Sequence, residues 1–244
     1  YNQTVHYFIC QNNLPLIQDL WIQSHEPIEY TNVKVIVQSE PEFFQPWTTY
    51  LPKLEPQTPT HIQQIPLNLS TEFLSGLDRR MVGTITVLVM VQGQLKAKQV
   101  FPVTLLAYQE WGGMSVIPES ITCFVLPAHE TVTMLTEQAK QILKQWGGTG
   151  FYGYQSHQPS DVYYQMAAIY QVLQAKEFEY QTPQANFEQA GQMVQPPDKV
   201  LEKQLGNCFD LTLLYAGCLE ALGLHPIIIW MQNHVFIGCW VRDM

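Results

Sequence analysis

The sequence predicts an α+β protein in which a β-rich segment precedes a segment of helices that ends in a pair of strands. Two successive apolar patterns indicate this order. Before about residue 107, apolar and polar residues alternate with the period of two that is typical of strands with one buried face. From His129 onwards the apolar spacing is that of amphipathic helices. The chain has 244 residues, 46% of them hydrophobic, which is enough for two ordinary domains.

The first domain, residues 1–107, is expected to consist of several short strands. The alternation is clearest over 33–37 and 85–91, and Gln92-Gly93 predicts a hairpin turn before the apolar run at 95–106. Earlier apolar runs predict strands at 5–10 and 16–22, and a short helical turn is expected at 70–74. Short strands separated by frequent turn residues favour a β-sandwich of immunoglobulin-like type.

Residues 108–127 are interpreted as a connector, and Trp111 within it as a structural plug between the domains rather than a ligand platform. The second domain is then expected to span 128–244. We expect one helix from about His129 to Trp146 and a second capped by Ser160. Further segments follow: an extended piece that begins at 178–180, a polar loop at 181–195 and a short helical turn at 198–204.

The chemistry-bearing stretch begins at Cys208. Asn207 is a good helix N-cap, Asp210 fits the third position of a capping box, and Gly223 fits a C-terminal cap. Cys208 is therefore predicted in the first turn of a buried helix. The unpaired N–H groups and partial positive charge of a helix N-terminus stabilise a thiolate, and the same groups can bind an oxyanion formed during acyl transfer.

A candidate base for this thiol follows in the chain. A buried strand is expected over 224–231, a turn at Gln232-Asn233, and a second strand that His234 opens. A histidine at that strand end is expected to face the helix N-terminus, where it could accept the thiol proton and return it to a leaving group. Taken alone, Cys208 could instead be a small buried residue, because free cysteine is often buried and inert.

Four segments in order carry a resemblance to a known family. They are PDKVL at 197–201, GNCFD at 206–210, GLHP at 223–226 and HVFIG at 234–238. Together they resemble the transglutaminase-like superfamily, which has a papain-like Cys-His core, and the ordered match covers about 178–241. The resemblance implies Cys208 as nucleophile and His234 as base. The Cys-x-Asp variant is similar to domains of large bacterial proteins that also carry helicase or nuclease modules and are associated with phage defence.

The family also uses an acidic third member, usually on the strand after the histidine. Asp243 lies only nine residues past His234, too close for a hairpin return, so we do not expect it to be this partner. Asp210 could contribute instead, or it could serve the helix cap alone. The chain starts at Tyr1 and stops just after a strand-like run, so we expect a fragment of a longer polypeptide with further domains and a second domain cut short at its C-terminal end.

Two functions remain open on this basis. The first is a cysteine peptidase or acyl transferase that acts on an amide or isopeptide bond of a protein or peptide substrate, with hydrolysis preferred over transamidation. The second is a catalytically inactive module of the same fold that serves protein interaction or assembly.

Composition restricts the remaining classes. A net charge of -9 with only 12 Lys and Arg argues against direct binding of nucleic acid, and no apolar run is long enough to span a membrane. The five cysteines have no repeated spacing, so neither a disulfide framework nor a metal site nor any other cofactor is expected, and reduced thiols fit the cytoplasm. Cys218 and Cys239 are interpreted as core, His225 as surface, and Gln204 as structural rather than an oxyanion donor.

Overall fold

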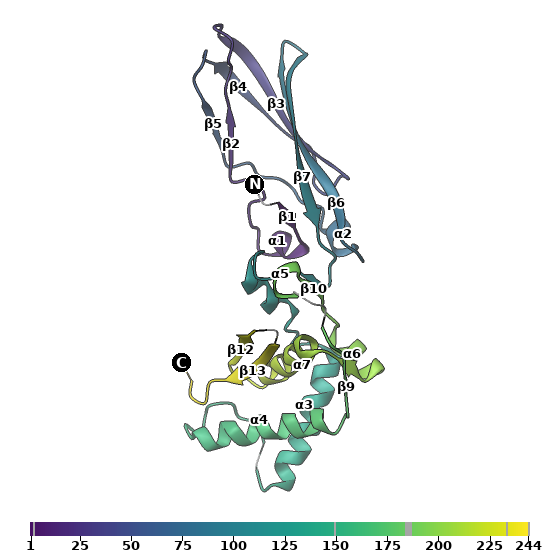
Figure 1. Cartoon of the computed structure of the whole chain (residues 1–244). Coiled ribbons are helices and arrows are strands. Elements are labelled where there is room, and N and C mark those ends of the chain that lie inside the picture. The colour runs from purple at the N-terminus through teal and green to yellow at the C-terminus, as the bar shows by residue number, and fades with distance from the viewer. Residues whose placement is uncertain (2, 149, 184–186, 233, 244) are drawn as a thin grey trace. The chain divides into compact units, whose positions relative to one another are not determined.

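The computed structural model describes the whole chain except residues 2, 149, 184–186, 233 and 244. The chain folds into two compact units, Tyr1–Glu110 and Trp111–Met244, so the boundary lies inside the predicted connector. The predicted α+β character is confirmed (Figure 1). Each unit is described below by itself.

The first unit is built on a curled five-stranded sheet of order β1-β7-β6-β3-β4. Its strands are β1 (Thr4–Val5), β3 (Tyr30–Glu40), β4 (Trp47–Leu54), β6 (Met81–Val91) and β7 (Gln94–Leu105). β1 runs parallel to β7, and the other pairs are antiparallel. A second sheet pairs β2 (Asp19–Ile22) with β5 (Thr60–Gln63). Gln92 and Gly93 both have positive φ at the β6–β7 turn, so the predicted hairpin is confirmed.

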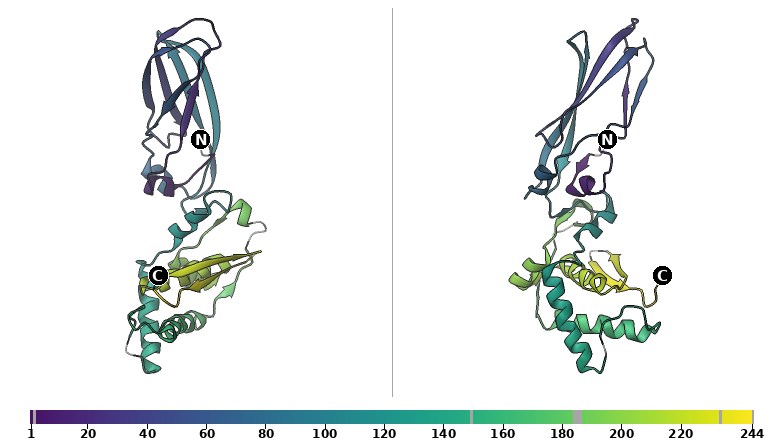
Figure 2. Two further views of the ribbon diagram at one scale, coloured as in Figure 1. Left: turned by 90° about the vertical axis from the view of Figure 1, so that its left-hand side faces the viewer. Right: turned by 180° about the vertical axis from the view of Figure 1, so that it is seen from behind.

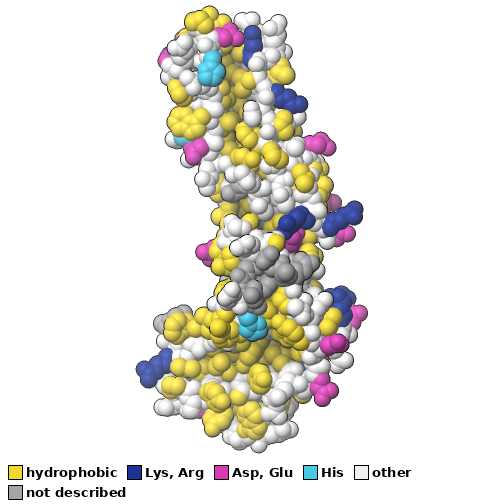
Figure 3. Space-filling view, in the orientation of Figure 1, with side chains coloured by type: hydrophobic (Ala, Val, Ile, Leu, Met, Phe, Trp, Pro, Cys, Tyr) yellow, Lys and Arg dark blue, Asp and Glu magenta, His cyan; other side chains and the backbone are white. Residues whose placement is uncertain are grey.

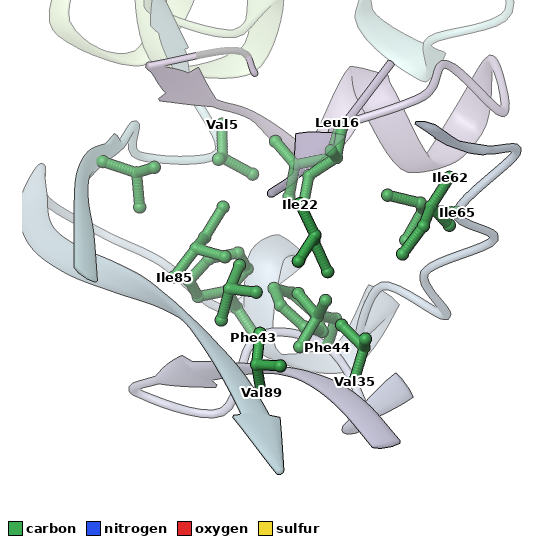
Figure 4. Close-up of a cluster of buried hydrophobic side chains, with 14 of the residues drawn as sticks. Val5, Leu16, Ile22, Val35, Phe43, Phe44, Ile62, Ile65, Ile85 and Val89 are labelled. Atoms are coloured by element: carbon green, nitrogen blue, oxygen red, sulfur yellow. The ribbon is translucent and has the colours of Figure 1, made fainter. Parts of the chain in front are cut away.

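Side chains from both sheets form the core of this unit. Figure 4 shows Ile22 of β2 and Ile62 of β5 on one side, and Val35 of β3 with Val89 of β6 on the other. Phe43, from the loop between β3 and β4, is fully buried among them. The predicted alternation is confirmed, because alternate residues over 33–37 of β3 and 85–91 of β6 are buried in this core.

One predicted strand of the first unit is wrong. Residues 5–10 do not form a strand, because β1 ends at Val5 and the helix α1 (Tyr7–Gln11) follows. The cause is a cap: the His6 side chain accepts a hydrogen bond from the N–H of Phe8 at 3.2 Å. The predicted helical turn near Ser70 is α2 (Thr71–Ser75), with Ser70 as its N-cap. The strand expected over 16–22 is shorter and begins at Asp19.

The second unit contains three longer helices, a hairpin and several short elements. The helices are α3 (Glu130–Gln145), α4 (Pro159–Gln174) and α7 (Cys208–Ala221), and the hairpin consists of β12 (Pro226–Met231) and β13 (His234–Cys239). The short elements are β8 (Glu110–Trp111) at the boundary, η1 (Pro118–Phe124), β9 (Glu179–Tyr180), α5 (Phe187–Ala190), β10 (Gln192–Met193), α6 (Pro197–Lys203) and β11 (Leu205–Gly206).

These helices agree with the apolar spacing of the sequence except at one cap. Ser160 does not cap α4, because Pro159 is already helical and Gln158 is the N-cap. The fixed φ of proline suits the first helical position, where an N–H would have no intrahelical partner in any case. The loop predicted over 181–195 contains the short elements α5 and β10, although part of it lies outside the described residues.

α7 is the central element of the second unit. Ten of its residues are buried, and α3, α4 and α6 contact it together with both strands of the hairpin. Figure 2 shows β12 and β13 lying across this helix. The predicted turn at Gln232-Asn233 includes a residue outside the described part of the chain. Within the described residues, no helix is long and apolar enough to cross a membrane.

Candidate functional site

The helix α7 begins at Cys208, as the sequence predicts, and a complete capping box fixes this start. Asn207 Oδ1 accepts hydrogen bonds from the N–H groups of Phe209 at 2.9 Å and Asp210 at 3.0 Å. In return, Asp210 Oδ2 accepts from the N–H of Asn207 at 3.3 Å. The N–H of Cys208 has no acceptor within its own helix, because it belongs to the first turn. The thiol therefore lies at the electropositive end of a well-anchored helix.

The Asp210 carboxylate is buried and engaged in local structure. Besides capping, its two oxygens accept from the N–H of Gln195 at 2.9 Å and from Gln195 Nε2 at 3.1 Å. Burial raises the pKa of Asp210 from its ordinary value, and the hydrogen bonds from Gln195 and Asn207 oppose that rise. Asn207 is the helix cap and Gln195 comes from the segment before α6, so the observed role of Asp210 is to hold the start of α7 and to tie that segment to it.

Cys208 belongs to a small hydrophobic cluster distinct from the main core of the second unit. Its side chain is only 4% exposed. The buried members of the cluster are Trp111, Ile121, Val194, Cys208, Phe209, Leu213 and Val235. Trp111 stacks on Trp230 of β12 with 5.0 Å between ring centroids. The thiol thus has apolar neighbours from η1, α7 and the hairpin.

A tyrosine that the sequence did not single out lies beside Cys208. The parallel pairing of β9 with β11 sets Tyr180 opposite Gly206, two residues before the cysteine. Burial raises the pKa of Tyr180, and hydrogen bonding of its hydroxyl to the Cys208 thiol raises it further, while the backbone of Cys208 acts in the opposite direction. The phenol is therefore a second polar group at the thiol.

His234 is the first residue of β13, and its backbone lies close to the same cluster. Its neighbour Val235 is buried within the cluster, and the Val235 carbonyl accepts from Thr212 Oγ1 of α7 at 3.2 Å. Successive side chains of a strand point to opposite faces. His234 is accordingly exposed and stacks on Phe236 with 6.3 Å between ring centroids.

The structure thus brings the backbone of His234 to the cluster but not its imidazole. Among the described residues, no hydrogen bond joins His234 to Cys208.

The remaining singled-out residues take separate positions. Asp243 accepts from His225 Nε2 at 3.2 Å, and both side chains are exposed. Cys218 is fully buried, and burial raises its pKa to about 12. Cys239 is half-buried, with its sulfur 3.8 Å from the Tyr154 hydroxyl. Gln204 has positive φ and ends α6. Within the described part of the chain, no group of three or more His, Cys, Asp or Glu side chains could hold a metal ion.

An open groove of about 880 Å³ adjoins this cluster. Its walls are η1, β12 and the last turns of α7, and Ile121, Ile228 and Trp230 belong both to the groove and to the cluster around Cys208. Glu119 and Glu220 supply acidic groups to its lining. On the face of the second unit that Figure 3 shows, hydrophobic side chains also gather at the surface. A groove of this composition suits an extended, largely apolar ligand.

Tyr180 could not be identified from the local pattern. The sequence indicates an extended piece at Phe178-Glu179-Tyr180, but its partner strand β11 is only two residues long and carries no alternation. The sequence marks only the position opposite Tyr180, which is Gly206. A Cβ atom there would lie 3.1 Å from the Leu211 side chain and would crowd the turn into α7.

Comparison of the chain with family models, with curated proteins and with solved structures gave no match.

Proposed function

We propose that the second unit is a transglutaminase-like cysteine hydrolase that cleaves an amide or isopeptide bond of a protein or peptide. Cys208 is the nucleophile and His234 the base. The observation that carries this proposal is the position of the Cys208 thiol, at the capped N-terminus of α7 with the Tyr180 hydroxyl beside it. A helix N-terminus stabilises the thiolate, which is the reactive form of cysteine.

The reaction would proceed through a thioester. Cys208 Sγ attacks the carbonyl carbon, the thiol proton passes to the His234 imidazole, and the leaving amine takes that proton as the C–N bond breaks. Water then resolves the thioester. This sequence requires the His234 ring to rotate from its place on Phe236 toward the thiol.

The setting of the site is part of the proposal. We propose that the first unit is an immunoglobulin-like β-sandwich, which the shared core between its two sheets supports. The chain would belong to a larger bacterial protein of the cytoplasm that acts in phage defence, as the resemblance of residues 178–241 implies. Reduced cysteines fit that compartment, because the described cysteines form no disulfide.

A second candidate function is a catalytically inactive module for protein interaction or assembly. One observation favours it: the His234 side chain lies on the hairpin face opposite to Val235, which packs with Cys208. A base on the wrong face of a strand cannot accept the thiol proton. In this case the groove would bind a partner rather than a substrate.

Acyl transfer to Cys208 separates the two candidates. The chain is mixed with p-nitrophenyl acetate at neutral pH, and the modified cysteine is located by mass spectrometry. A hydrolase gives a burst of nitrophenolate of one equivalent, with the acetyl group on Cys208 and a slower release of acetate. Cys208→Ala serves as the control and should lose the burst. Acetylation spread over the exposed thiol of Cys123 and surface lysines, with no burst, would leave the inactive module.

A further inference from the structure

The strand β12 has an edge to which no other strand is paired. Among the described residues, β13 is the only strand that pairs with β12, so its other edge is open. All residues of β12, with the sequence PIIIWM, are apolar. Edge strands of proteins are usually charged, covered or very short, because an open apolar edge is a template for pairing with another chain. The open edge of β12 is therefore a candidate site for a further strand.

The register of the hairpin shows which backbone groups point to this edge. Trp240 N–H donates to His225 O at 3.1 Å, so these two residues form a hydrogen-bonded pair just outside the two strands. Along an antiparallel ladder such pairs alternate with pairs whose N–H and C=O groups point outward. Pro226 and Ile228 occupy positions of the second kind. The carbonyl of Pro226 and both the N–H and the carbonyl of Ile228 therefore point to the open edge.

The groove described above runs along this edge. Its lining includes the three consecutive residues Pro226, Ile227 and Ile228. Successive side chains of a strand point to opposite faces, so a groove that contacts all three lies beside the strand rather than over one of its faces. The helix η1 forms the opposite wall, with Pro118 and Ile121. The outward backbone groups of β12 thus face a space of about 880 Å³.

The charges at the groove indicate what kind of occupant fits it. Glu119 of η1 and Glu220 of α7 are exposed and line the groove, and its described lining contains no Lys or Arg. A second copy of the chain, paired edge to edge, would bring like charges together in a protein whose net charge is already -9. A basic segment would instead be attracted to the two glutamates. The charge therefore favours a basic partner over self-association.

We propose that the open edge of β12 and its groove bind an extended peptide segment of another protein, which adds to the hairpin as a third strand. The backbone of the segment pairs with that of Ile228. Its side chains alternate between apolar and polar, and a Lys or Arg among them lies near Glu119 or Glu220. Strand addition of this kind obtains affinity from main-chain hydrogen bonds and specificity from the alternate side chains. The proposal does not depend on any chemistry at Cys208.

Short random peptides displayed on phage and selected against the whole chain supply the probe. A selected peptide is synthesised with a single N-methyl group at successive positions, and fluorescence anisotropy measures its affinity. Methylation at every second position removes an N–H that points to β12 and should weaken binding roughly tenfold, whereas the positions between should respond far less. A loss at both kinds of position, or at neither, would overturn strand addition, and so would a selection that yields no peptide.

Glu220→Lys tests the charge of the groove. Glu137→Lys is the matched control, because Glu137 is an exposed residue of another helix, α3, and does not line the groove. We expect Glu220→Lys to weaken binding of the selected peptide at least about threefold at low salt, and Glu137→Lys to leave it nearly unchanged. Equal effects of the two substitutions would overturn a basic occupant. A chain that sediments as a dimer and selects no peptide would overturn the proposal in favour of a second copy at the same edge.

Discussion

Asn207 and Asp210 exchange side-chain hydrogen bonds across the first turn of α7. Asn207 Oδ1 accepts from the N–H of Asp210 at 3.0 Å, and Asp210 Oδ2 accepts from the N–H of Asn207 at 3.3 Å. This reciprocal cap fixes where the helix starts and hence which residue occupies its first position. Because that residue is Cys208, the same two side chains that stabilise the helix also orient the candidate nucleophile.

We therefore expect Asp210→Ala to destabilise the second unit strongly. The substitution leaves the buried N–H of Asn207 and the part-buried N–H of Gln195 without their carboxylate acceptor, and Gln195 Nε2 keeps only its bond to the Leu205 carbonyl. The expected loss in the free energy of unfolding is roughly 3 kcal/mol, measured by urea denaturation.

Asp198→Ala is the matched control for the cap. Asp198 is also an acidic residue in the first turn of a helix, α6, but its side chain is 48% exposed. Its removal should cost far less, because an exposed first-turn carboxylate interacts only weakly with the helix N-terminus. Equal losses for the two variants would show that burial of the Asp210 network does not matter.

Gly191 gives a second prediction, which concerns the approach of the chain to Trp111. Its φ is +77°, and a Cβ atom would lie 2.2 Å from the backbone oxygen of Trp111. Gly147 has a similar φ of +87° with nothing within 4 Å. Gly147→Ala should thus cost about 1 kcal/mol from backbone strain alone.

Gly191→Ala must in addition displace the backbone of Trp111, so its cost should exceed that of Gly147→Ala by roughly 2 kcal/mol or more. Denaturation midpoints of the two variants measure the difference. If the two alanines cost the same, the close approach of Gly191 to Trp111 is not present in solution.

The sequence predicts local structure here better than it predicts contacts between distant segments. The start of α7 follows from Asn207 and Asp210 because a cap is a pattern of four neighbouring residues. Two local errors have local causes, since the His6 side chain caps α1 and Pro159 rather than Ser160 begins α4. The pairing of β9 with β11, which brings Tyr180 to Cys208, joins segments more than twenty residues apart and leaves no periodic signal.

The sequence also could not predict which face of the hairpin the His234 side chain occupies. That a histidine opens the last strand can be read from the apolar run that follows it. Which face of the hairpin it occupies depends on the register of β12 with β13, where Met231 is opposite His234 and Trp230 opposite Val235. A shift of one residue would exchange the two faces.

The buried thiol of Cys218 should make the free energy of unfolding depend on pH. Burial raises the pKa of its thiol to about 12 from an ordinary value of 9.0, so the native state holds this proton more tightly than the unfolded state does. Stability from this group is fully present below pH 9 and is lost as the pH rises toward 12, up to roughly 4 kcal/mol.

Urea denaturation at pH 8 and pH 11 measures this effect. Wild type should lose clearly more stability between these two values than Cys218→Ala, which cannot ionise at that position. The alanine variant starts from lower stability because of the cavity it leaves, but only the difference between the two pH values is compared. Parallel losses in both proteins would mean that the Cys218 thiol ionises without penalty.

The rate at which each cysteine reacts with iodoacetamide tests the central claim most directly. The chain is labelled at pH 7, quenched at intervals and digested, and each cysteine peptide is quantified by mass spectrometry. We predict that Cys208 reacts fastest although it is buried, ahead of the exposed Cys123 and far ahead of Cys218, and that His234→Gln slows Cys208 alone. Slower labelling of Cys208 than of Cys123, with no effect of His234→Gln, would contradict a nucleophilic cysteine at the start of α7.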